Sequence, residues 1–181
     1  MKVIFFALWF FALNIGTACA EPISLHVEES PPTNMVALIA SENQMLPVDI
    51  HALPDGSLSW KGGFIGAVVF EDTIKNCAIY TFERGLLNPV FADAPCEFKG
   101  PPKLMRDRGV LVPDVVYELS VFWPNRDAMV DHLVALYYDA EKDGFCESRS
   151  LADWYQSGNR NLSPNLQDGQ CTVGSDLAVD K

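Results

Sequence analysis

Four cysteines after residue 20 constrain the fold of this chain more than any other feature. They are Cys77, Cys96, Cys146 and Cys171, separated by 18, 49 and 24 residues. An even number of cysteines in an exported chain is typical of disulfides, whereas a four-thiolate zinc site needs close pairs such as Cys-x-x-Cys. We predict the pairs Cys77–Cys96 and Cys146–Cys171, because each joins an expected element to a nearby loop flanked by proline or glycine. The sequence therefore predicts two disulfides and no metal site.

The first 20 residues have the pattern of a secretory signal peptide. Met1-Lys2 is a short positive start, residues 3–15 carry no charge, and Ala18-Cys19-Ala20 supplies small residues before Glu21. This arrangement is typical of a signal with an A-x-A cleavage site. A membrane anchor would need an apolar run of about 20 residues, and a lipoprotein acylated at Cys19 would need a leucine near its position −3. We therefore expect cleavage, and a secreted or periplasmic protein with no stable membrane insertion afterwards.

The charge balance narrows the classes of partner. The chain has a formal net charge of −11, with 49% apolar and 20% charged residues, which is typical of a globular protein. The segment 1–20 contains one lysine and no carboxylate, so its removal leaves a net charge of −12. Such an acidic chain lacks the basic surface that nucleic acids and anionic lipids require. A basic protein is the partner that this charge favours.

Most of the chain after residue 20 reads as β-strands. Alternating or continuous apolar patterns predict strands over 23–27, 48–53, 64–70, 77–82 and 115–123. The turn 54–57 predicts a hairpin between 48–53 and 58–60, with Gly56 in the left-handed conformation. Residues 35–40 fit either a strand or a buried helix, and the proline-rich segment 88–114 predicts a long loop with at most one short strand.

One segment carries a helical pattern. Apolar residues recur at helical spacing after Asn125, a suitable N-cap: Met129, Leu133, Leu136, Tyr137 and Ala140. Lys142 and Gly144 would end this helix, and a second helix is expected over 148–156.

Strands followed by helices predict an α+β fold, mainly an antiparallel sheet with one or two C-terminal helices, braced by disulfides. We expect a single domain over residues 21–157. The polar segment 158–181 is expected to be a surface tail tied back by Cys171.

Residues that could carry chemistry are few. Asp49 and His51 are expected on one face of a strand, where a carboxylate and a histidine could begin an acid–base or metal site. Neighbouring acids are common in so acidic a chain, and no catalytic or cofactor-binding motif occurs. We therefore assign no catalytic residue and no cofactor.

Aromatic pairs suggest binding instead. Trp60 and Phe64 flank two glycines, and Trp154 and Tyr155 lie in a polar stretch. Large aromatic side chains often anchor protein interfaces. The alternative is that all four belong to the core.

These observations favour a secreted or periplasmic acidic binding module, such as an inhibitor or immunity-type protein that caps a basic protein. The first alternative is an envelope or extracellular hydrolase using Asp49, His51 and Asp114. The second is an envelope structural protein. The sequence does not predict the oligomeric state.

Overall fold

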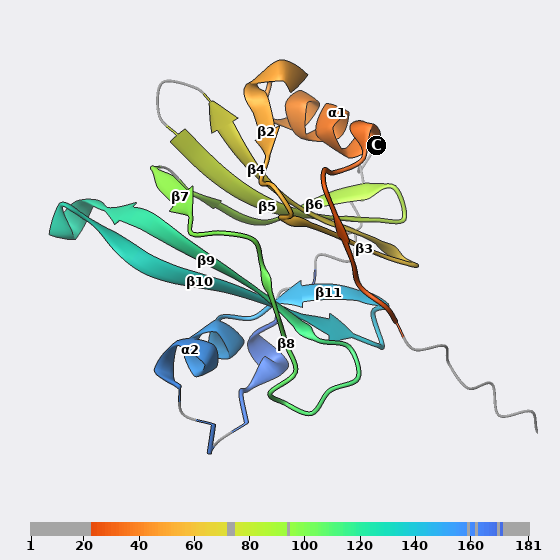
Figure 1. Cartoon of the computed structure of the whole chain (residues 1–181), viewed down its shortest axis with the longest axis vertical. Coiled ribbons are helices and arrows are strands. Elements are labelled where there is room, and N and C mark those ends of the chain that lie inside the picture. Colours follow the sequence, from red (N-terminus) through yellow and green to blue (C-terminus); the bar gives the residue numbers. More distant parts are fainter. Residues whose placement is uncertain are drawn as a thin grey trace, which may run out of the picture.

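The computed structural model contains two antiparallel sheets packed face to face, with one helix on the outer face of each sheet (Figure 1). It describes residues 23–71, 75–93, 95–158, 160–161, 163–169 and 171. The expected signal peptide, residues 1–20, lies outside these described residues. The resulting order of layers is helix, sheet, sheet, helix.

The first sheet has six strands in the order β1-β3-β4-β5-β6, with β2 also paired to β4. Its strands are β1 (His26–Glu28), β2 (Ile50–Ala52), β3 (Ser57–Trp60), β4 (Gly63–Glu71), β5 (Lys75–Glu83) and β6 (Leu86–Asp93). Since β5 occupies one edge of β4, the short strands β2 and β3 share the other edge.

The second sheet has the order β11-β10-β9-β7, with β8 also paired to β9. Its strands are β7 (Cys96–Phe98), β8 (Lys103–Met105), β9 (Asp114–Trp123), β10 (Ala128–Asp139) and β11 (Gly144–Glu147). The long hairpin of β9 and β10 forms its centre, with Tyr117 opposite Val134 and Val115 opposite Leu136.

Each helix covers one sheet. Helix α1 (Thr33–Glu42) buries Met35 and Ile39 against the outer face of the first sheet. Helix α2 (Arg149–Ser157) covers the second sheet. Its N-cap is Ser148, whose side chain accepts a hydrogen bond from the backbone N–H of Leu151. Three short 3-10 helices complete the elements: η1 (Pro47–Asp49), η2 (Pro124–Arg126) and η3 (Leu166–Asp168).

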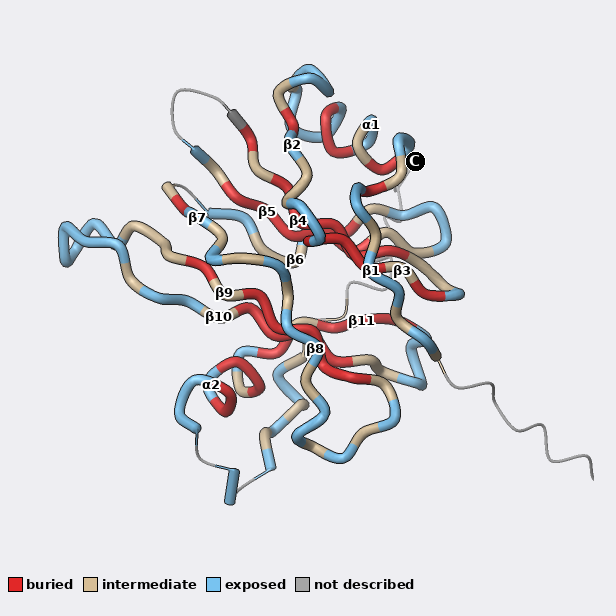
Figure 2. Tube along the Cα trace, in the orientation of Figure 1, coloured by how far each residue is buried: buried red, intermediate tan, exposed pale blue. Residues whose placement is uncertain are grey.

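The main core lies between the two sheets, where buried residues of both sheets face each other (Figure 2). The disulfide Cys77–Cys96 joins β5 of the first sheet to β7 of the second. The disulfide Cys146–Cys171 ties the C-terminal segment to β11. Both predicted pairs are confirmed, and so is the α+β class with mainly antiparallel sheets and disulfide bracing.

The strongest helix prediction is wrong, because residues 128–139 form strand β10. The C-terminal half of β10 is buried on both faces: Val134 and Leu136 face the first sheet, whereas Ala135 and Tyr137 face α2. A strand buried on both faces loses its polar–apolar alternation. The apolar residues of β10 match a helical spacing by coincidence. Asn125, the expected N-cap, lies within the 3-10 helix η2 and does not begin an α-helix.

Further expectations need correction. The strand at 48–53 does not pair with residues 58–60, because β2 and β3 both pair with β4. Asp55, with φ 53°, takes the left-handed position that was expected for Gly56. The segment 88–114 contains β7, β8 and most of β6 instead of one long loop. Residues 35–40 belong to α1, which is the helical alternative for this segment, and α2 is the expected C-terminal helix.

Candidate functional site

An open groove with a volume of about 1640 Å³ lies at one end of the two sheets. Three segments form most of its walls: the β3–β4 turn at residues 61–62, the β8–β9 loop at residues 108–112, and the β10–β11 turn. Leu166 and Gln167 of η3 extend one side. The groove therefore combines elements of both sheets and of the C-terminal segment.

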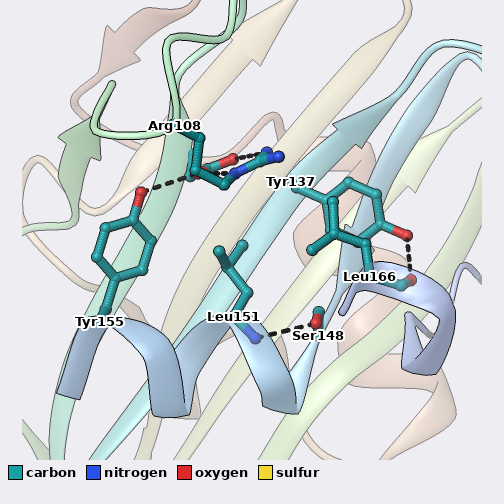
Figure 3. A network of polar contacts seen from close by, with 7 residues as sticks. Arg108, Tyr137, Ser148, Leu151, Tyr155 and Leu166 are labelled. Atoms are coloured by element: carbon teal, nitrogen blue, oxygen red, sulfur yellow. Dashed lines mark hydrogen bonds and ion pairs between the residues drawn. The ribbon is translucent and has the colours of Figure 1, made fainter. Parts of the chain in front are cut away.

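The β8–β9 loop is held by a buried ion pair at its base. The Arg108 guanidinium donates two hydrogen bonds to the Asp114 carboxylate, at 2.7 and 2.6 Å, and the Tyr155 hydroxyl donates a third at 2.8 Å. Asp114 is fully buried, whereas the Arg108 side chain is 16% exposed. Figure 3 shows Arg108 of the loop and Tyr155 of α2, which both donate to the Asp114 carboxylate. This network fixes the loop relative to both sheet and helix.

The same network perturbs two of its members. Hydrogen bonding to Asp114 raises the pKa of Arg108, so this guanidinium stays charged. Burial raises the pKa of Tyr155, and its hydrogen bond to Asp114 raises the pKa further, so the hydroxyl remains a donor. The charged guanidinium and the neutral phenol both donate to the Asp114 carboxylate, which suits the network to positioning the loop.

A second set of contacts holds the loop to the end of α2. Arg160 lies 3.3 Å from the Asp107 carboxylate and donates a 2.6 Å hydrogen bond to the backbone oxygen of Trp154. Its guanidinium also lies over the Trp154 ring, 4.2 Å from the centroid. Cation–π packing of this kind keeps both partners in place.

One rim of the groove is acidic. Asp139 at the end of β10 and Glu141 and Asp143 of the β10–β11 turn line it, whereas Lys61 and Arg108 line other parts of the groove and Lys142 lies 4.0 Å from Asp139. Asp139 accepts hydrogen bonds from the backbone N–H of Glu141 and Lys142, at 2.9 and 3.3 Å, which shapes the turn. Asp143 accepts from the Tyr138 hydroxyl and lies 3.5 Å from Arg84, and its φ of 52° is left-handed. Within the described residues, the exposed carboxylate of Glu141 forms no ion pair.

Beneath this rim, Glu83 connects the two sheets. Its Oε1 accepts a 3.0 Å hydrogen bond from the backbone N–H of Phe145, and a Cβ atom on Gly144 would overlap its Oε2. Burial raises the pKa of Glu83, an effect opposed by the hydrogen bond from Phe145 and by Arg84 and enhanced by Asp143. A fourth acid, Glu83, therefore lies next to the acidic rim.

The opposite wall is apolar. Val110, Leu111 and Val112 line it, and the Leu111 side chain is 84% exposed. The backbone oxygen of Leu111 accepts a 2.6 Å hydrogen bond from Arg106, which holds the loop tip outward. Leu111 is the most exposed of the large hydrophobic residues in the described part of the chain, so it offers an apolar contact at the groove.

The aromatic residues predicted to bind are buried in separate layers. Trp60, Phe64, Trp154 and Tyr155 are each at most 9% exposed. Trp60 packs edge-on to Phe145 between the sheets, Phe64 packs under α1, and the other two pack between α2 and the second sheet. These four residues therefore form no common exposed surface, although Trp60 contributes to the groove wall.

The acidic and histidine candidates are not brought together either. Asp49 lies in η1 rather than on the strand, and His51 is exposed on β2 of the first sheet. Asp114 lies in the second sheet, where Arg108 and Tyr155 occupy its oxygens. None of the three lines the groove; Asp114 only contacts Arg108, which does.

One group of side chains resembles a metal site in its spacing. Ligand atoms of Asp139, Cys146 and Cys171 lie within 4.8 Å of one another. The two cysteines form a disulfide, so they offer no thiolate to an ion.

Sequence reasoning missed the residues that form the groove walls. The carboxylates at 139, 141 and 143 were assigned to the end of a helix, and Leu111 to an irregular loop. Two signals were present: three acids within five residues, and three consecutive aliphatic residues between Gly109 and Pro113.

No family model matches the chain, and no curated protein or solved structure is significantly similar to it. Among the described residues, no helix is long and apolar enough to cross a membrane. The two disulfides are typical of proteins from oxidising compartments.

Proposed function

We propose that this chain is an exported binding module, secreted or periplasmic, that captures a basic protein at the groove. The observation that carries this proposal is the pairing of an acidic rim with an exposed aliphatic wall across one open groove. Apolar contact supplies affinity once water is excluded, and charge of one sign speeds the approach of an oppositely charged partner.

The chemistry of the partner follows from the rim. Asp139, Glu141 and Asp143 repel anions, and the chain carries a net charge of −11. A cationic protein surface with an apolar residue near its basic groups complements both walls. An inhibitor or immunity-type protein that caps a basic enzyme or toxin needs such a combination of acidic and apolar surface.

The test is capture from the secreted or envelope fraction of the producing cells at low and high salt. The bait is the mature protein with its disulfides intact, compared with Glu141→Lys and with Leu111→Ser. Both side chains are exposed, so neither substitution disturbs the core. We expect one basic protein to be retained by the wild type at low salt, and each variant to reduce its retention at least tenfold.

Matched controls lie outside the groove. Glu42→Lys, at the end of α1, makes the same charge change, and Leu46→Ser removes an aliphatic side chain that is 65% exposed. Both controls should retain the partner like the wild type. Equal loss in the groove variants and the controls, or no protein retained by the wild type at low salt, contradicts the proposal.

A further inference from the structure

Trp60 presents an unused hydrogen-bond donor in the wall of the groove. Its side chain lines the groove and is 6% exposed, and its indole Nε1 has no hydrogen-bond partner among the described residues. A buried N–H without an acceptor is unfavourable by about 1–3 kcal/mol. Since most buried polar groups in proteins are paired, this donor points to an acceptor that the chain does not itself supply.

The backbone of a glycine packs directly against the donor. A Cβ atom on Gly62 would lie 2.8 Å from Nε1 of Trp60 and 3.8 Å from the backbone oxygen of Asp143. Gly62 itself lines the groove. The indole N–H is therefore covered by the backbone of Gly62 and not by a side chain, so an acceptor reaches it only when the turn 61–62 moves.

Three requirements now apply to one occupant. It must bring an acceptor to the indole N–H, positive charge to the acidic rim, and apolar groups to Leu111 and its neighbours. A metal ion brings charge but no acceptor, and an anionic polymer brings acceptors but the wrong charge. An extended polypeptide segment brings all three, because main-chain carbonyls alternate with its side chains.

We propose, building on the function above, that the groove binds an extended basic segment of the partner protein. One main-chain carbonyl of this segment accepts the Trp60 indole N–H. Its lysine or arginine side chains pair with Asp139, Glu141 and Asp143, and an apolar side chain contacts Leu111. Binding thus supplies the hydrogen-bond acceptor that the Trp60 indole N–H lacks.

The indole N–H can be observed directly by ¹H–¹⁵N NMR of the mature protein. The probe is a capped hexapeptide that alternates lysine with leucine, and the matched control peptide has glutamate in place of lysine. Trp60→Phe assigns the resonance by its loss, and the indoles of Trp123 and Trp154 serve as internal references. We expect the lysine peptide to move the Trp60 indole proton downfield and slow its exchange with solvent, with no effect of the glutamate peptide.

Two variants separate the hydrogen bond from the charge. Trp60→Phe keeps an aromatic side chain but removes the indole N–H. It should therefore weaken binding of the lysine peptide about fivefold, as expected for the loss of one hydrogen bond. Gly62→Ala keeps every charge and fills the acceptor position, so it should abolish the shift of the Trp60 resonance. If folding suffers in either variant, the wild-type resonance alone still decides the question.

The inference is overturned if the lysine peptide leaves the Trp60 resonance unmoved, or if the glutamate peptide moves it equally. If the resonance does not respond while Glu141→Lys and Leu111→Ser still impair capture of the partner, the function stands and the peptide mode fails. If the resonance responds but no basic protein is captured, the proposed function fails while the peptide site remains.

Discussion

Asp114 is the residue on which the shape of the groove depends most. It is fully buried, and its oxygens accept from Arg108 and Tyr155. A buried charge is tolerated only when it is paired, and removal of one partner leaves the other charge uncompensated. The Arg108–Asp114 pair therefore serves to hold the loop that carries Leu111.

We predict that Asp114→Asn lowers the free energy of unfolding by about 3 kcal/mol, because Arg108 then keeps its charge without a counter-charge. Tyr155→Phe removes one hydrogen bond to the carboxylate and should lower it by about 1.5 kcal/mol. Urea denaturation measures both values. An Asp114→Asn loss no greater than that of Tyr155→Phe would show that the ion pair does not hold the loop.

Glu83 makes stability depend on pH. Its pKa is raised by burial above the ordinary value, so the folded state binds the proton more tightly than the unfolded state does. The folded state is then favoured at low pH, and this contribution is lost as the pH rises from the unfolded pKa of Glu through the raised folded pKa.

We predict that Glu83→Gln reduces the decrease in the free energy of unfolding as the pH rises. Glutamine still accepts a hydrogen bond from the Phe145 N–H, and it carries no charge. The variant and wild type should be similar in stability near pH 4, and the variant relatively more stable at pH 7. Urea denaturation from pH 4 to pH 8 tests this. Parallel curves for the two proteins would mean that Glu83 does not titrate in this range.

Cysteine pairing was predictable at the residue scale, whereas the groove was not. Four cysteines allow three ways of forming two disulfides, and the way with the two shortest loops is observed. The groove instead depends on Asp143 and Leu111, which lie 32 positions apart in the sequence and meet only through the tertiary fold. The burial of Trp60 likewise depends on the packing of the two sheets, which local sequence does not show.

At the scale of elements, strands with a continuous apolar run were predicted well, whereas β10, which is exposed over much of its N-terminal half and buried on both faces only in its C-terminal half, was not. β4, β5 and β9 match expected strands because their apolar runs are bounded by turns or proline. β10 imitates a helix because α2 covers one of its faces and the first sheet the other. Whether a strand is covered on both sides is decided by distant elements, so local periodicity cannot show it.

The C-terminal segment is an element of the groove that depends on its disulfide. Leu166 lines the groove, and its backbone oxygen accepts a 3.2 Å hydrogen bond from Tyr137 (Figure 3). Asp168 accepts from Ser148 and from the backbone N–H of Ser150, both at 2.7 Å. The disulfide of Cys171 therefore fastens a segment that also rests on α2.

We predict that replacing Cys146 and Cys171 together by serine lowers stability by about 3 kcal/mol in the chain-entropy account. The backbone amides of residues 163–169 should also exchange faster with solvent. Replacing Cys77 and Cys96 together is the matched control, since the sequence separations are 25 and 19. Hydrogen exchange by mass spectrometry distinguishes the two, and equal protection of 163–169 in both variants would contradict this role for Cys171.

At the scale of the whole molecule, the two sheets and two helices leave one end open. The β3–β4 turn, the β8–β9 loop and the β10–β11 turn meet there, and the disulfide between β5 and β7 joins the two sheets. A rigid body with loops gathered at one end is a common arrangement for recognition.

The association rate of the captured basic partner tests the central claim most directly. It is measured with the wild type, with Glu141→Lys and with the control Glu42→Lys, at a series of salt concentrations. We predict that the rate for the wild type and the control falls steeply with salt, and that Glu141→Lys has a slower rate at low salt with a shallower dependence. The same salt dependence in all three proteins would contradict the claim that the groove rim captures the partner.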